Sequence, residues 1–345
     1  MDNTYSFDNH IISIAQKAQG SIALAESMDP RVQSAALKLI KLNAVSKVAL
    51  FGAKDAIISS ARSHGLALDN DDRILWVDES IEDLQDKVAS DYDQKMRLKG
   101  RTIDKDKIKA WAASPINQSS WLVAQGIVDG GVAGCTKPTA EVIRSALMHI
   151  GPKQEKGTIS SCFAMIGPQT EKKPVKIFMY ADCAVMIDPD SDQLVDIAEA
   201  TAHTFKKLFT DIEPKLAFLS FSTKGSARHA KQSKVATAFT RFKEKNPHII
   251  CDGELQFDAA IVSSIAEQKC PDSPLHGEAN CFIFPNLDAG NIAYKITQRL
   301  GGFQAYGPIL QGLAKPYNDL SRGASAEDIV IGSLITIAQK DSDPS

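Results

Sequence analysis

The stretch Asn318-Asp-Leu-Ser-Arg-Gly-Ala-Ser-Ala-Glu-Asp-Ile-Val330 joins a polar loop to the beginning of an apolar segment. Within eight residues it supplies a hydroxyl (Ser321), a permanent cation (Arg322) and a carboxylate (Asp328). An arginine binds an oxyanion through two parallel hydrogen bonds, a carboxylate accepts a proton, and a hydroxyl donates to a developing negative charge. Transfer of an acyl group between phosphate and a thiol requires these three functions.

The same stretch also predicts an ordinary helix start. Residues 329–338 are mostly apolar, which favours a helix, and Ser325 stands where its N-cap is expected. Asp328 follows three residues later, where a capping box places an acidic or amide side chain. Asp328 is therefore a capping residue, a catalytic base, or both. The glycine-rich residues 301–312 upstream predict a loop.

Outward from this stretch, short apolar strands alternate with longer amphipathic helices. The clearest helix covers 191–208, and others are predicted at 31–41 and 139–150, where Thr139 is the expected cap. The strands lack period-2 alternation, as strands buried on both faces do. The pattern predicts an α/β protein with parallel sheets. The predicted strands cover residues 22–24, 48–51, 74–77, 131–133, 158–165, 175–180, 216–220, 257–262 and 281–284.

Length and charge restrict the possibilities further. A chain of 345 residues favours two domains, and residues 151–157 read as a linker or an exposed hairpin between them. The net charge of −3 argues against a nucleic-acid surface but permits local binding of anions. No apolar run approaches the roughly 20 residues of a membrane span.

The cysteines predict a reduced environment. Six are scattered without a C-x-x-C pair, mostly in apolar runs, so we expect buried thiols rather than a zinc site or a redox pair. The first five residues show no signal-peptide pattern, and the expected location is the cytoplasm. Neither a dinucleotide fingerprint nor the acidic spacing of a metal cage is present, so no cofactor or metal is expected.

Two further segments have spacings that suggest anion binding. Thr136-Lys-Pro-Thr139 leads into the helix that carries Arg144, and a helix N-terminus with hydroxyls and an arginine suits phosphate. The alternative is that Thr139 only caps and that Arg144 is a solvated surface charge. Ser222-Thr-Lys-Gly-Ser226 resembles a phosphate loop but lacks the Walker spacing, which indicates a strand-to-helix turn.

Several motifs in the same order resemble phosphate acetyltransferases (phosphotransacetylases) of the short form. The resemblance covers nearly the whole chain and is strongest from about residue 175 onward. It implies reversible transfer of acetyl between coenzyme A and inorganic phosphate in acetate metabolism, with acetyl phosphate as the partner substrate. The motifs are the 318–330 stretch, Phe284–Lys295, Gly307–Gly312, Ser220–Ala227, Tyr180–Val185 and Asp252–Ala260.

The resemblance also implies an architecture. It predicts two α/β domains with a central cleft, like isocitrate and isopropylmalate dehydrogenases, in a homodimer. The first domain would comprise residues 1–151 and 300–345, the second residues 152–299, and the active site would lie in the cleft between them.

The resemblance implies the site residues too. Asp328 would be the general base on the coenzyme A thiol, Arg322 the phosphate anchor and Ser321 the donor to the oxyanion. The residues it places around phosphate or coenzyme A are Arg31, Thr139, Arg144, Asn291, Tyr294, Lys295, Gly307 and Gln311.

Two departures from the family pattern affect arginines. Leu24-Ala-Glu-Ser27 stands before Arg31 where the family usually has P-E-G. A further family arginine would fall on Met96, with Lys95 and Arg97 on either side. A shift of one residue rotates a helical side chain by about 100°, so this role stays open.

Three alternatives remain. Phosphate butyryltransferase shares the fold and the chemistry, and a catalytically silent acetyl-CoA-sensing module or a metal-dependent β-decarboxylating dehydrogenase shares the fold. The presence of Ser321, Arg322 and Asp328 together argues against a silent module.

Overall fold

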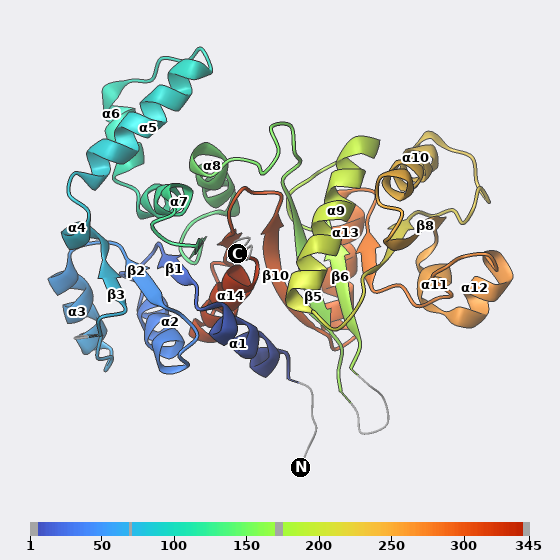
Figure 1. The fold of residues 1–345 in the computed structure, drawn as a ribbon, viewed down its shortest axis with the longest axis horizontal. Helices are drawn as coiled ribbons and strands as arrows, with labels where there is room; N and C mark the ends of the chain where they lie inside the picture. The colour runs from blue at the N-terminus through green and yellow to red at the C-terminus, as the bar shows by residue number, and fades with distance from the viewer. Residues whose placement is uncertain (1–5, 69–70, 170–174, 341–345) are drawn as a thin grey trace. The chain divides into compact units, whose positions relative to one another are not determined.

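A computed structural model describes residues 6–68, 71–169 and 175–340. The chain divides into two compact units, one formed by residues 8–153 and 313–345 and the other by residues 1–7 and 154–312. The first five residues, discussed above for their lack of a signal pattern, lie outside the described part. Figure 1 labels the elements of both units.

The unit of residues 8–153 and 313–345 is built on a parallel sheet. Its strand order is β11-β4-β1-β2-β3, with β1 Ser21–Leu24, β2 Lys47–Leu50, β3 Ile74–Trp76, β4 Gly130–Ala133 and β11 Tyr317–Asp319. The chain runs from β1 towards β3 on one side and returns through β4 to β11 on the other. The order therefore reverses between β1 and β4, which is where open α/β sheets bind ligands at the carboxyl ends of their strands.

Helices cover both faces of this sheet. On one face, α2 (Pro30–Lys41) packs against α14 (Ala326–Ala338), and on the other α7 (Pro115–Gln125) packs against α8 (Thr139–His149) (Figure 1). A hydrophobic core that includes Phe51, Trp121 and Tyr317 fills the space around the strands. The remaining helices of the unit are α1 Phe7–Ala18, whose first residue belongs to the other unit, α3 Lys54–Ser63, α4 Val77–Ser80, α5 Leu84–Leu98 and α6 Lys105–Ala112.

The other unit contains a mixed sheet in the order β10-β5-β6-β9-β7-β8. Strands β6, β9, β7 and β8 are parallel, and β5 pairs antiparallel with both β6 and β10. Its core includes Phe163, Tyr180 and Phe282. The elements are β5 Ser160–Ile166, β6 Ile177–Ala181, α9 Ser191–Leu208, β7 Lys215–Leu219, α10 Ala230–Lys245, β8 Ile250–Leu255, α11 Phe257–Ile261, α12 Ser263–Lys269, β9 Cys281–Ile283, α13 Leu287–Arg299 and β10 Gln304–Gln311.

The structure confirms the α/β class and most predicted elements, but two predictions were wrong. Residues 257–262 were expected to be a strand, but Phe257–Ile261 form the short helix α11. Residues 301–312, expected to be a loop, contain β10, which pairs with β5. That pairing places residues 300–312 in the mixed-sheet unit, although the prediction assigned them to the first domain.

Two expected features of the chain can be compared with the described residues. All six cysteines are buried and free, as predicted. Among the described residues, no helix has the length and apolar character that crossing a membrane requires.

Candidate active site

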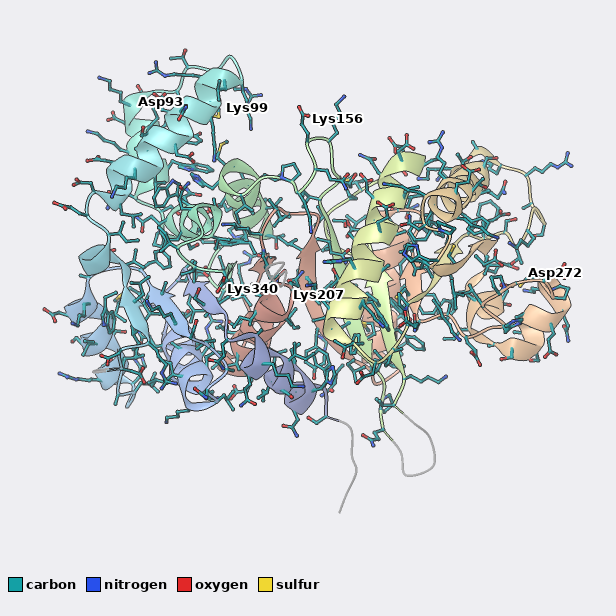
Figure 2. All side chains as sticks on the ribbon, in the orientation of Figure 1. Asp93, Lys99, Lys156, Lys207, Asp272 and Lys340 are labelled. Atoms are coloured by element: carbon teal, nitrogen blue, oxygen red, sulfur yellow. The ribbon has the colours of Figure 1, made fainter. Side chains whose placement is uncertain are left out.

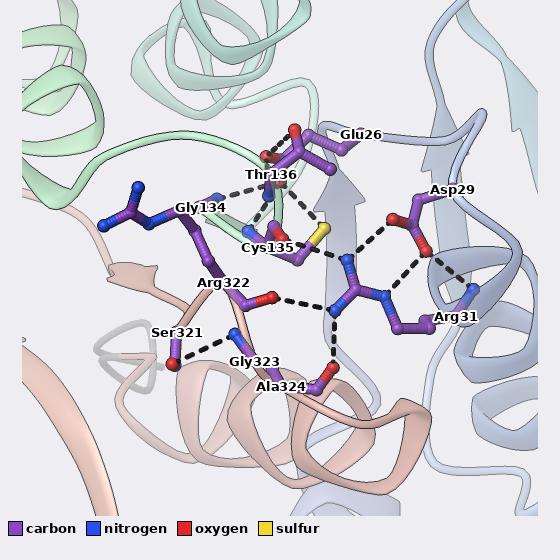
Figure 3. Close-up of polar contacts among 10 residues, drawn as sticks. All are labelled: Glu26, Asp29, Arg31, Gly134, Cys135, Thr136, Ser321, Arg322, Gly323 and Ala324. Carbon is purple, nitrogen blue, oxygen red and sulfur yellow. Dashed lines mark hydrogen bonds and ion pairs between the residues drawn. The ribbon is translucent and has the colours of Figure 1, made fainter.

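Three loops meet at the carboxyl ends of β1, β4 and β11. They carry Asp29 and Arg31 after β1, Cys135 and Thr136 after β4, and Ser321 to Ala324 after β11 (Figure 3). The parallel order of the sheet explains the meeting, because the carboxyl ends of neighbouring parallel strands share one edge. The sequence motif around Arg322 therefore lies at the position where this type of sheet places function.

Arg31 ties the three loops together. Its Nε and Nη2 donate to the two carboxylate oxygens of Asp29 at 2.9 and 2.7 Å, and Nη2 also donates to the carbonyl of Cys135 at 3.0 Å. Its Nη1 donates to the carbonyls of Arg322 at 3.0 Å and Ala324 at 2.8 Å. A guanidinium has five N–H groups, so Arg31 has none left for a substrate anion.

The backbone N–H and the side chain of Arg31 keep Asp29 ionised. It is the N-cap of α2, accepting from the backbone N–H of Arg31, and it forms the bidentate ion pair with the Arg31 side chain. The Arg31 hydrogen bond lowers the pKa of Asp29 and raises the pKa of Arg31. The pair is thus charged at neutral pH and fixes the loop after β1.

Glu26, which the sequence did not single out, holds the loop after β4. Its carboxylate accepts hydrogen bonds from the backbone N–H groups of Gly134 (2.8 Å), Cys135 (3.2 Å) and Thr136 (2.8 Å), and from the Thr136 hydroxyl (2.8 Å). Three consecutive N–H groups form a concavity that suits an anion, and here the anion is a side chain. Its one sequence signal is an acidic residue directly after an apolar strand.

The Ser321–Ala324 loop leaves its ligand-binding groups available. Arg31 fixes the loop through its carbonyls, while the Arg322 guanidinium is exposed, extends away from Arg31 and has no polar partner among the described residues (Figure 3). Ser321 accepts one hydrogen bond from the N–H of Gly323 at 3.2 Å. The backbone N–H groups of Ser321 and Arg322 likewise have no partner in the described part of the chain. A hydroxyl, a guanidinium and two N–H groups can together bind an oxyanion.

Asp328 forms the predicted capping box. Its Oδ2 accepts from the Ser325 N–H at 2.8 Å and from the Ser325 hydroxyl at 2.9 Å, and its own N–H donates to the Ser325 oxygen at 3.1 Å. Its side chain is exposed, and Oδ1 accepts no hydrogen bond within the described chain. One oxygen therefore caps α14 while the other is open to a proton donor.

Thr139 and Arg144 lie on α8. The prediction that Thr139 caps this helix was wrong, because Pro138 occupies the cap position and Thr139 is the first helical residue. The Thr139 hydroxyl donates to Oδ2 of Asp319 at 2.5 Å. Arg144 is exposed and has no partner among the described residues, so it can reach an anionic ligand.

The mixed-sheet unit carries the other predicted residues. On α13, Asn291 donates to the carbonyl of Cys183 at 2.9 Å and accepts from the exposed Lys295 at 2.7 Å. Tyr294 stacks on Phe163 with ring centroids 4.1 Å apart, and burial raises the pKa of its hydroxyl. Of these residues, Lys295 is the one that presents a charge to solvent.

Two further predicted residues, Gly307 and Gln311, lie on β10. Gln311 is buried, and its amide bonds with Ser160, Thr201 and Thr204 inside the unit. Gly307 sits at a register shift of the strand with φ +154°, where a Cβ would lie 2.8 Å from the Cys162 carbonyl oxygen. Packing of β10 gives both residues a structural role, and the proposal below does not use them.

The structure gives the contacts of the three residues around the expected family arginine at Met96. Met96 is buried in α5. Lys95 contacts the Asp91 carboxylate at 3.0 Å and donates to the carbonyl of His149 at 3.1 Å, whereas Arg97 pairs with Asp93, which Figure 2 labels, on the exposed side of α5. An exposed i,i+4 pair is weak, so Arg97 can exchange partners more readily than Lys95.

The described residues contain no group of three or more histidine, cysteine, aspartate or glutamate side chains that would hold a metal ion. The segment Ser222–Ser226 is the strand-to-helix turn that the sequence predicted, between β7 and α10.

Comparison with known proteins agrees with the geometry. The family model described as phosphate acetyl/butaryl transferase matches residues 6–337. The phosphate acetyltransferase of Acetivibrio thermocellus is 42% identical over 338 residues, which are 97% of this chain and 98% of that protein. A crystal structure of a phosphotransacetylase from Streptococcus pyogenes superposes with a TM-score of 0.86 at 38% identity, covering 97% of this chain and 98% of that one.

A more distant structure shows the shared fold alone. A putative 4-hydroxythreonine-4-phosphate dehydrogenase from Salmonella typhimurium has a TM-score of 0.54 at 10% identity, covering 93% of this chain and 99% of that one. This agrees with the expected dehydrogenase-like architecture. On the family model and the near-complete relatives, the chain belongs to the phosphate acetyl/butaryl transferase family of transferases.

Proposed function

We propose that the protein transfers an acetyl group reversibly between coenzyme A and inorganic phosphate. The observation that carries this proposal is the Ser321–Ala324 loop, which Arg31 fixes through its carbonyls while the Arg322 guanidinium stays exposed without a partner among the described residues. A prearranged donor set needs no reorganisation as charge develops, which is the largest single contribution to many enzymes' rates.

The chemistry assigns one role to each group. The coenzyme A thiol attacks the carbonyl carbon of acetyl phosphate, its proton passes to Oδ1 of Asp328, and the carbon–sulfur bond forms. The tetrahedral oxyanion accepts hydrogen bonds from Ser321 and the neighbouring N–H groups. The carbon–oxygen bond to phosphate then breaks, and phosphate leaves while bound to Arg322. The route needs no covalent enzyme intermediate, redox cofactor or metal.

Other residues are candidates for binding the substrates or for positioning the loops. Arg144 and Thr139 are our candidates for binding phosphate or coenzyme A at the start of α8, and Lys295 is the candidate on α13. Asn291 and Tyr294 support α13 through the Cys183 carbonyl and the Phe163 ring. Arg31 and Glu26 are positioning residues, because their donors and acceptors are used by the loops themselves.

A thioester assay tests the reaction. Purified protein is incubated with acetyl phosphate and coenzyme A, with and without a metal chelator, and thioester absorbance is followed. We expect rapid thioester formation that the chelator does not change. Turnover with butyryl phosphate but not acetyl phosphate would show that the substrate carries a longer acyl chain. Coenzyme A binding without turnover of either would indicate a sensing module.

We also propose a cytoplasmic homodimer. Six buried free cysteines suit a reducing compartment. Ile292, Ile296 and Leu300 are 56%, 52% and 85% exposed on one stripe of α13, and a contiguous exposed apolar stripe marks an interaction surface. Light scattering should give twice the chain mass for the wild type and one chain mass for Ile296→Glu. A monomeric wild type at micromolar concentration would refute the dimer.

A further inference from the structure

Asp319 is a buried carboxylate within the candidate site that the proposed mechanism does not use. It is the last residue of β11, two residues before Ser321, and its relative exposure is 5%. Its Oδ2 accepts the Thr139 hydroxyl at 2.5 Å, and its Oδ1 has no hydrogen-bond partner among the described residues. A half-satisfied buried carboxylate costs stability, so its presence at this edge of the sheet needs an explanation.

The surroundings of Asp319 are tight and acidic. A Cβ on Gly134, whose φ is +110°, would lie 2.4 Å from Oδ1, so the backbone of the loop after β4 approaches the carboxylate directly. The charged or titratable groups that act on it are Glu26, from the loop after β1, and Tyr317, from the same strand. Burial raises the pKa of Asp319 to about 6, Glu26 adds to the rise, and the Thr139 hydrogen bond opposes it.

The Thr139 hydroxyl has one proton to donate. When Asp319 is ionised, that proton is held in the 2.5 Å hydrogen bond, and Thr139 presents only lone pairs to a ligand. When Asp319 is protonated, its own O–H donates to the Thr139 oxygen. The threonine proton is then free to point at an incoming oxyanion.

We propose that Asp319 is a positioning residue that sets the donor direction of Thr139, so that binding of the phosphate group is coupled to uptake of one proton by the Asp319–Thr139 pair. The inference rests on the proposed function, since it takes the start of α8 as a phosphate-binding segment. Charge supports it as well. Glu26 and Asp319 flank residues 134–136, and an anion arriving at Thr139 is repelled less when Asp319 is neutral.

The test compares three variants with the wild type. Asp319→Asn keeps the shape, and its amide can donate to Thr139, which mimics the protonated state. Thr139→Val removes the hydroxyl at nearly constant volume, and Thr139→Ser restores it. The measurements are the KM for inorganic phosphate and the KM for coenzyme A from about pH 5 to about pH 8, together with the number of protons taken up when inorganic phosphate binds, obtained by calorimetry in buffers of different ionisation enthalpy.

In the wild type and in Thr139→Ser, the KM for phosphate should rise as Asp319 ionises, by up to about tenfold for each pH unit, while the KM for coenzyme A stays flat. Phosphate itself titrates in this range, but Asp319→Asn experiences the same titration and therefore provides the baseline. Asp319→Asn should keep a low phosphate KM and lose the extra proton uptake. Thr139→Val should have a high phosphate KM at every pH.

Equal pH slopes and equal proton uptake in the wild type and Asp319→Asn would overturn the inference. If Asp319→Asn does not fold, Thr139→Val decides the question. A phosphate KM in Thr139→Val that follows the wild-type pH dependence would also overturn the inference. Failure of the proposed function looks different: the wild type would then form no thioester at any pH.

Discussion

The loops after β11 and after β7 both follow a buried strand and lead into a helix, but they use their polar groups in opposite ways. In residues 321–324, Arg31 holds the loop through hydrogen bonds to the carbonyls of Arg322 and Ala324, and the Arg322 guanidinium stays exposed. In residues 222–227, the backbone N–H groups donate to the loop itself, to Ser220 and to strand β8, and Lys224 is paired with the buried Asp252.

The hydrogen bonds that the β7 loop makes with itself and with β8 show why it is a turn and not a phosphate site. Gly225 donates to Glu254 at 2.8 Å, Thr223 to the Ser226 hydroxyl at 3.0 Å and Ala227 to the Ser222 hydroxyl at 3.1 Å. The comparison of the two loops indicates that a loop with glycine, serine and a cation binds a ligand only if its hydrogen-bond donors remain free after folding. The missing Walker spacing predicted the turn, but only the structure shows which groups use the donors of the loop.

The largest expected effect separates the two loop cations. Arg322→Ala should lower kcat/KM about 10³-fold, because it removes the charge that binds the leaving phosphate. Lys224→Ala is the matched control and should leave activity unchanged. Thioester formation at fixed coenzyme A measures both. Equal losses in the two variants would show that the loops do not differ in function.

The second effect sharpens the comparison within the β11 loop and the helix that follows it. Asp328→Asn should lower kcat about 10²-fold, since an amide cannot take the thiol proton. Asparagine caps a helix about as well as aspartate, so the midpoint of thermal unfolding should change little. If the variant loses stability and keeps kcat, Asp328 is only the cap of α14.

The comparison also shows what the sequence could predict. The motif grouped Ser321, Arg322 and Asp328 because these residues are close along the chain, and the structure places them in the loop after β11 and in the first turn of α14. Glu26 and Asp319 escaped notice because their partners, Gly134 and Thr139, are about a hundred residues or more away in sequence. A tertiary contact of that kind leaves no local pattern.

The missed elements have similar causes. Strand β8 contains Asp252, Gly253 and Glu254, which are unfavourable in a strand until Lys224 pairs with Asp252 and the β7 loop donates hydrogen bonds to Glu254. Strand β10 is interrupted at Gly307 and Pro308, so its residues resemble a loop until β5 pairs with them. Helix α9, in contrast, was predicted with its exact bounds, since its amphipathic period and capping box are local.

A third experiment removes the side chain that holds each loop through hydrogen bonds. Arg31→Ala should lower the free energy of unfolding by about 2–3 kcal/mol, because three carbonyls and Asp29 lose a charged donor, and it should lower kcat as well. Glu254 on β8 holds the β7 loop in the corresponding way, and Glu254→Gln should lower the free energy of unfolding by about 1–2 kcal/mol without changing kcat. Denaturant unfolding and the thioester assay are measured on the same preparations. An unchanged kcat in a folded Arg31→Ala would contradict its positioning role.

Asp319→Asn should have the smallest effect on activity. Unlike Arg31→Ala and Glu254→Gln, it should raise the stability of the protein. The folded pKa of Asp319, about 6, lies above the ordinary value of 3.8, so the folded state holds a proton that the unfolded chain releases between these values. Stability should therefore fall as the pH rises from about 4 to about 6, by about 3 kcal/mol in total. Asp319→Asn should lack this slope and be more stable than the wild type at neutral pH. Urea unfolding at several pH values measures the difference in stability between the two proteins, in which the contributions of the other titrating groups cancel.

A variant that is less stable than the wild type at neutral pH would mean that the ionised carboxylate of Asp319 stabilises the end of β11. In that case the Oδ1 of Asp319, unpartnered among the described residues, would not be a cost in stability that the β11 loop bears for its function.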